Sequence, residues 1–109
     1  MKIITSGHQM KVGQALQQHA EEKLNKISNK YVTIALNAKV IFEKKDHFFK
    51  AEIILHEAAK RYAFSTAETT DAYKSFDAAF HKVEKQLHKY KEQMKNHNNT
   101  DVTDKKTLM

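Results

Sequence analysis

The sequence predicts an α+β domain with the order β-α-β-β-β-α, in which a four-stranded sheet carries two helices packed on one face. Two segments, residues 12–28 and 71–95, repeat apolar residues at alternating spacings of three and four, as amphipathic helices do. Between them lie three segments rich in β-branched and aromatic residues, at 33–43, 49–56 and 61–68. A short apolar segment at the start of the chain completes four predicted strands.

The chain opens with a predicted strand at residues 1–6 and a turn at Gly7-His8, where glycine eases the change of direction. The first helix is predicted over residues 12–28, with Gly13 as a weak N-cap. Its spacing predicts a buried stripe formed by Val12, Leu16, Ala20, Leu24 and Ile27. Because this helix joins the first two strands, they are expected to lie parallel in a right-handed crossover.

The other three strands are predicted to form antiparallel hairpins, because the connections at residues 44–47 and 57–60 are short. In the strand at 61–68, alternate side chains point to opposite faces, Tyr62 and Phe64 to one and Ala63 and Ser65 to the other. The sheet face opposite the helices is left for water or for a partner.

The long helix is predicted to begin after an N-cap at Thr69 or Thr70, with Asp71 complementing the helix dipole. Its apolar seam consists of Tyr73, Phe76, Phe80, Val83, Leu87, Tyr90 and Met94. Farther on the chain is polar and lacks any apolar period. Residues 97–109 are therefore expected to be a disordered tail attached to a single domain of residues 1–96.

The composition favours an anionic partner. The 109 residues contain 19 Lys plus Arg against 13 Asp plus Glu, a formal net charge of +6. Such an excess favours RNA, DNA or an anionic membrane surface, although it also serves simple solubility. Cysteine is absent, which excludes disulfides and thiolate chemistry. The apolar run at the start is too short for a signal peptide and no run is long enough to span a membrane, so a cytoplasmic protein is expected.

Catalytic motifs are missing from the sequence. None of the seven histidines is paired at the i, i+4 spacing of a helical zinc site, and His81 and His88 stand two turns apart, about 10 Å. Two glycines cannot build a phosphate-cradling loop, and no serine or threonine lies in a nucleophile motif. We therefore expect no enzyme activity, no metal and no cofactor.

Lysines crowd the second half of the long helix, and Lys23 and Lys26 lie on the first helix. If the two helices lie side by side, these lysines merge into one patch that can hold a polyanion. The alternative is that they merely solvate the outer surface. Contacts between lysine and phosphate are electrostatic and read no base sequence by themselves.

The order of residues in the long helix resembles that of a known family. The stretches Asp71-Ala-Tyr-Lys-Ser-Phe-Asp77 and Lys82-Val-Glu-Lys-Gln-Leu-His-Lys-Tyr-Lys91 are similar to motifs of the ribosome hibernation promoting factors. This family includes the ribosome-associated inhibitor A proteins, and older descriptions call its members sigma-54 modulation proteins. The opening Ser6-Gly7-His8 and the pattern from Ala15 to Ile27 agree, so the resemblance covers roughly residues 1–95.

The resemblance implies a fold related to double-stranded RNA-binding domains and a function without catalysis. Family members bind the small ribosomal subunit between head and body, where they overlap the sites of mRNA and tRNA. They block translation in stationary phase or starvation, and some promote pairing of ribosomes into inactive dimers. The residues implied to contact ribosomal RNA phosphates are Lys23, Lys26, Lys82, Lys85, Lys89 and Lys91. By the same resemblance Tyr73, Phe76 and Leu87 are expected in the core and Asp71 at the helix start.

Some positions depart from the family pattern. Lys85 stands where arginine is frequent, which keeps the charge but loses bidentate geometry. Gln17 stands where a basic residue is common, and His81 replaces a frequent acid. Long members carry a second domain that pairs ribosomes, whereas here only a short polar segment follows. The chain is thus expected to be either a short-form protein or the N-terminal domain of a longer one, and a monomer when free.

Two other functions stay open on the sequence alone. An ordinary double-stranded RNA-binding module usually places lysines at the first turn of its final helix, where this chain has only Lys74. A protein-interaction domain that modulates transcription would not need the lysines. Only the RNA-binding functions predict an affinity that falls steeply with salt.

Overall fold

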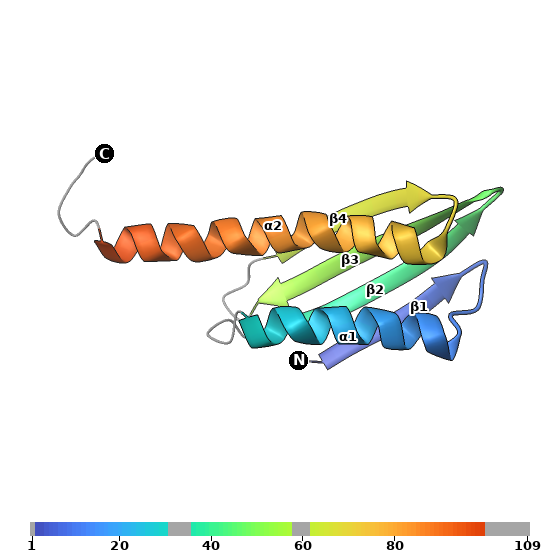
Figure 1. The fold of residues 1–109 in the computed structure, drawn as a ribbon, viewed down its shortest axis with the longest axis horizontal. Coiled ribbons are helices and arrows are strands. Elements are labelled where there is room, and N and C mark those ends of the chain that lie inside the picture. The colour runs from blue at the N-terminus through green and yellow to red at the C-terminus, as the bar shows by residue number, and fades with distance from the viewer. Residues whose placement is uncertain (1, 31–35, 58–61, 100–109) are drawn as a thin grey trace.

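The computed structural model describes residues 2–30, 36–57 and 62–99, which form one mixed sheet and two helices (Figure 1). The elements are β1 (Lys2–His8), α1 (Gln14–Lys30), β2 (Leu36–Lys45), β3 (Phe48–Glu57), β4 (Tyr62–Thr69) and α2 (Ala72–Asn99). The strands lie in the order β1-β2-β3-β4, with β1 parallel to β2 and the other pairs antiparallel. Both helices cover the same face, so the predicted fold is confirmed.

The core lies between the sheet and the helices. From α1 it takes Leu16, Ala20, Leu24 and Ile27, all at most 6% exposed, as the predicted stripe requires, whereas Val12 precedes the helix and is only partly buried. The sheet supplies alternate residues, namely Ala38, Val40, Phe42, Ala51, Ile53, Leu55 and Ala63. The apolar side chains that recur at helical spacing on α1 thus pack against those that alternate along the strands.

The predicted seam of α2 is largely correct. Phe76, Val83 and Leu87 are buried and Phe80 is partly buried, but Tyr73 is 40% exposed and lies outside the core. The ring of Tyr73 instead meets the His19 ring of α1 edge-on, with centroids 5.2 Å apart. Its position near the helix start leaves one side of the ring in solvent. The side chains of Tyr90 and Met94 lie outside the described residues.

The turn after β1 differs from the predicted one. β1 continues through Gly7 to His8, and Gln9 adopts the left-handed conformation with φ of 64°. Gly7 has a negative φ, so conformational freedom is not why glycine stands there. A Cβ at this position would collide with the carbonyl oxygen of Met10 and press against Val12. Glycine is needed because the backbone passes too close for any side chain.

Replacing Gly7 with alanine is therefore expected to lower the free energy of unfolding by about 1–3 kcal/mol, the usual cost of overpacking. The exposed neighbour Ser6 provides the control, because Ser6→Ala should change stability by less than about 0.5 kcal/mol. Urea unfolding of both variants measures the difference. Equal stability of the two would show that the loop moves away from the added methyl group without cost.

The start of α2 corrects the predicted cap. Asp71, not Thr69 or Thr70, is the N-cap, since its Oδ1 accepts hydrogen bonds from the backbone N–H groups of Tyr73 (2.7 Å) and Lys74 (3.4 Å). Its carbonyl also accepts the first helical bond, from the N–H of Ser75 at 2.9 Å. Thr69 stabilises the cap from outside, because its Oγ1 accepts a hydrogen bond from the Asp71 N–H at 3.1 Å.

Hydroxyl groups tie α2 to the sheet. Ser75 is fully buried, and its Oγ donates to the carbonyl of Phe49 (2.5 Å) and accepts from the backbone N–H of Thr69 (3.0 Å). Ser65 of β4 donates to the carbonyl of Ala79 at 2.6 Å. These buried bonds set the position of α2 along the strands, because a slipped helix would leave polar groups unpaired.

The helix α2 and the β2–β3 hairpin differ in length from the predicted elements. α2 ends at Asn99, so the first three residues of the predicted tail are helical, and residues 100–109 lie outside the described residues. The C-terminal part of α2 runs beyond the strands (Figure 1). The hairpin between β2 and β3 turns at Asp46-His47, a tighter connection than predicted, with a φ of 51° at Asp46. Most of the predicted turn between β3 and β4 lies outside the described residues.

Candidate nucleic-acid interface

The outer side of α2 carries a row of basic side chains, which we call the α2 ridge. It consists of Lys74, His81, Lys85, His88 and Lys89, all exposed and all on the side opposite the buried seam. Asp77 and Glu84, the two acids of α2 whose side chains are described, point instead toward α1. Lys74, Lys85 and Lys89 therefore present the formal positive charges of the ridge to solvent, and the side chain of Glu92, the third acid of α2, lies outside the described residues. Lys74, which the sequence analysis did not include in the patch, stands three helical turns before Lys85.

Lys82 was predicted to belong to the same patch, but the structure turns it to another side. Its Nζ donates to the carbonyl of Thr66 at the outer edge of β4, at 2.9 Å. There it borders a shallow hollow of about 300 Å³ with Lys45, Lys50 and Glu68. Lys45 and Lys50 come from the β2–β3 hairpin, and sequence spacing along one helix gives no sign that they lie near Lys82.

Lys23 lies in the groove between the helices. Its Nζ is 3.4 Å from Oδ1 of Asp77 and 5.5 Å from the centre of the Phe80 ring. The same carboxylate oxygen is 2.7 Å from Nε2 of His19. Lys23 therefore enters the groove with part of its charge already compensated, whereas Lys26, farther out on α1, is exposed.

The six predicted phosphate-binding residues thus form no single uniform patch. Lys85 and Lys89 lie on the α2 ridge, Lys26 stands across on α1, Lys23 is paired within the groove, and Lys82 faces β4. Lys91 lies on α2, but its side chain is outside the described residues. Asp77 and Glu84 offset part of the positive charge within the groove, where they pair with Lys23 and Lys30.

Two other kinds of feature, metal sites and membrane-spanning helices, would also indicate a function. Among the described residues, no three or more His, Asp or Glu side chains gather where they could hold a metal ion. The described helices include none that is both long and apolar enough to cross a bilayer.

A mixed four-stranded sheet with two helices on one face is the fold of solved ribosomal subunit interface proteins. The structure matches the ribosomal subunit interface protein of Coxiella burnetii with a TM-score of 0.75 and 30% identity, covering 84% of this chain and 98% of the other. The Protein Y N-terminal domain of Thermus thermophilus matches with a TM-score of 0.76, covering 83% and 99%, and at 24% identity it supports the fold alone.

The chain belongs to the family described as Sigma 54 modulation protein / S30EA ribosomal protein, whose model matches residues 3–95. The resemblance seen in the sequence is thereby confirmed, and so is the prediction that the chain is not an enzyme, because this family is not enzymatic.

Two curated relatives carry the family's functional name. The ribosome hibernation promotion factor of Rhizobium meliloti (strain 1021) is 27% identical over 99 residues, which cover 91% of this chain but 52% of that protein. The ribosome hibernation promoting factor of Azotobacter vinelandii is 32% identical over 92 residues, 84% of each. The chain therefore spans about half the length of the first relative and most of the second.

Proposed function

We propose that this protein is a cytoplasmic ribosome hibernation factor that binds the small ribosomal subunit through the outer side of α1 and α2. Bound there, it occludes the channel for mRNA and tRNA and inhibits translation in stationary phase or stress. Family membership and the names of the relatives support a role on the ribosome. The observation that carries the choice of surface is the α2 ridge, where Lys85 and Lys89 are exposed while Asp77 and Glu84 turn toward α1.

The chemistry of this surface suits a folded RNA. Lysine ammonium groups bind phosphates as point charges, so they recognise where phosphates lie and not which bases carry them. The ridge lies on a long helix that hydroxyl hydrogen bonds hold to the sheet, so the backbone positions of its lysines are fixed. A row of cations along a fixed helix suits an RNA whose phosphates are themselves fixed in space, as they are in a ribosomal subunit.

Co-sedimentation with purified small subunits at low and moderate salt tests the proposal. Binding should weaken steeply as salt rises, because counterions released from RNA drive association. Addition of mRNA and tRNA should displace the protein if it occupies their channel. Failure of the folded protein to bind subunits at low salt would overturn the proposal. Sedimentation of whole ribosomes with the protein shows whether they stay single or pair into dimers, because dimers sediment faster.

An ordinary double-stranded RNA-binding module is the second candidate. Against it, the first turn of α2 holds the Asp71 N-cap, whose carboxylate bonds the N–H groups that would otherwise meet a phosphate, and Lys74 is the single lysine there. Equal affinity for a plain RNA duplex and for the small subunit would favour this module. A transcription-modulating protein-interaction domain, the third candidate, predicts partner binding that survives reversal of the ridge lysines.

Replacement of Asp77 with asparagine is expected to tighten binding to the small subunit by about two- to tenfold. The change removes a negative charge 3.4 Å from Lys23 and frees that ammonium for a phosphate, a gain of order 1 kcal/mol. Filter binding at several salt concentrations measures it, and the salt dependence should also become steeper. Addition of Lys85→Glu to the Asp77→Asn variant should cancel the gain in affinity. An affinity of Asp77→Asn equal to that of the unmodified protein would place the groove outside the interface.

A further inference from the structure

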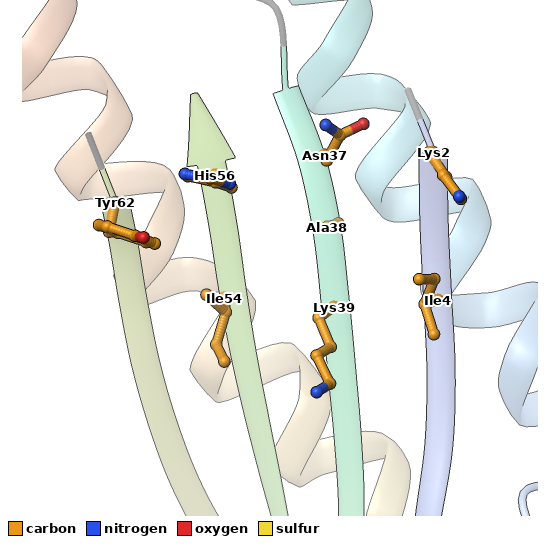
Figure 2. A pocket seen from close by; sticks show the side chains of 8 residues that line it. All are labelled: Lys2, Ile4, Asn37, Ala38, Lys39, Ile54, His56 and Tyr62. Atoms are coloured by element: carbon orange, nitrogen blue, oxygen red, sulfur yellow. The ribbon is translucent and has the colours of Figure 1, made fainter. Parts of the chain in front are cut away.

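The sheet face opposite the helices has an ordered arrangement of side chains. The strand register places them in rows that cross all four strands. The first row is Lys2, Asn37, His56 and Tyr62, and the second is Ile4, Lys39, Ile54 and Phe64. Figure 2 shows most of these side chains on neighbouring strands, with the helices behind the sheet.

All members of these two rows except Phe64 line a hollow of about 320 Å³, and the charged residues described in its lining are both lysines, Lys2 and Lys39. Acids appear on this face only in the next two rows among the described residues, as Glu52, Glu43 and Glu68. The first two rows therefore carry lysines and apolar side chains, whereas the next two rows carry acids as well. An occupant of the first two rows must combine flat or apolar groups with negative charge.

Aromatic rings lie open at this end of the sheet. The rings of His56 and Tyr62 are stacked, with centroids 4.5 Å apart and planes within 8°. Tyr62 is 59% exposed and Phe64 is 50% exposed. Tyr62 and Phe64 are two positions apart in β4, so they lie on the same face with their Cα atoms roughly 6.8 Å apart.

The strand that carries Phe64 is fixed by a side chain of α2. The side-chain amide of Gln86 on α2 donates to the carbonyl of Phe64 at 2.7 Å and accepts from its N–H at 3.1 Å. The backbone that presents Phe64 is therefore fixed even though β4 is an outer strand. A ring whose backbone is already ordered costs less entropy when a ligand stacks on it.

We propose that this face of the sheet binds single-stranded RNA, with bases stacking over Tyr62 and Phe64 and phosphates contacting Lys2 and Lys39. Exposed rings on an open four-stranded sheet, bordered by lysines, are the combination that single-stranded RNA requires. Two aromatic positions in succession fit consecutive bases of one strand better than a single nucleotide. An acidic peptide would satisfy the lysines but would gain little from flat rings. This surface is separate from the α2 ridge and does not depend on the proposed function.

The test is titration of the full chain with a short fluorescent single-stranded RNA at low ionic strength. Tyr62→Ala and Phe64→Ala should each weaken binding about 5- to 150-fold, the range expected for loss of one stacked base. Thr66→Ala, in the third row of the same face, should leave binding within about twofold. A Lys85→Glu/Lys89→Glu variant should lose no more binding than a Lys11→Glu/Lys44→Glu variant of the same net charge, because both pairs lie away from the two rows, and this comparison distinguishes the surface from the α2 ridge.

A second measurement guards against variants that fold poorly. Amide chemical shifts of the unmodified protein should change on the outer sheet rows of β1 to β4 when the RNA is added. Shifts confined to α1 and α2, or Tyr62 and Phe64 variants that fold normally and bind as well as the unmodified protein, would overturn the proposal. An acidic peptide that produces the same shifts while the RNA does not would assign the face to a protein partner instead.

Discussion

Replacing Lys85 and Lys89 with glutamate will lower the affinity for the small ribosomal subunit by about 100-fold or more. Each change turns an attraction to phosphate into a repulsion, and at about 1 kcal/mol per unit charge the two changes amount to roughly 4 kcal/mol before screening. The slope of log affinity against log salt should fall by about two, because two ammonium groups no longer neutralise a phosphate. Sedimentation or filter binding at several salt concentrations measures both quantities.

The matched control reverses two exposed lysines away from the helices' outer side, as Lys11→Glu/Lys44→Glu. Each double variant takes the formal net charge from +6 to +2, because two lysine-to-glutamate changes remove four positive charges (6 − 4 = 2). The control should therefore lose only the long-range part of the attraction, about tenfold or less at moderate salt. Equal losses in the two variants would mean that net charge, and not the α2 ridge, governs binding.

Truncating Phe76 to alanine will lower the free energy of unfolding by about 3–5 kcal/mol, the cost of an emptied aromatic site in a core. Phe76 is fully buried, with its ring 6.1 Å from Phe42 and 5.9 Å from Phe80, centre to centre. It thus joins α2 to the sheet beneath it. Domains of this size are usually stable by about 5–15 kcal/mol, so the variant should be close to unfolding at physiological temperature.

Urea unfolding followed by circular dichroism measures the loss at Phe76. Phe64→Ala provides the control, because it removes the same ring from a site that is 50% exposed. That variant should lose about 1–1.5 kcal/mol, since about half of the side chain is already in water. A similar loss at both positions would mean that the side chains around Phe76 close the cavity.

Periodicity predicted most of the fold because it records which side chains face the core. The spacing of Leu16, Leu24 and Ile27 placed one helix. The alternation of Tyr62 and Phe64 with Ala63 and Ser65 placed a strand, and the structure confirms both. Tyr73 has the right spacing but lies near the helix start, where the sheet no longer covers it completely. Cap position was also missed, since threonine and aspartate are both good caps and only the folded backbone shows that Asp71 bonds the first turn.

The candidate site was less predictable because it depends on contacts between distant segments. His19 and Asp77 are 58 residues apart, and their contact places a carboxylate beside Lys23. Helical spacing placed Lys82 with Lys85 and Lys89, but a carbonyl of β4 draws its amine to another side. Sequence spacing predicts which face of a helix a residue occupies. Contacts between residues of different helices become known only from the packed structure.

The side chains along the outer border of β4 have a consequence for how copies of the protein meet. An open strand border is a template onto which another chain can add its own strand and begin aggregation. Gln86 occupies both backbone groups of Phe64, and Lys82 occupies the carbonyl of Thr66. A second molecule would have to displace both side chains before it could extend the sheet at β4. Addition of a strand from another copy therefore meets more resistance at β4 than an open border would offer.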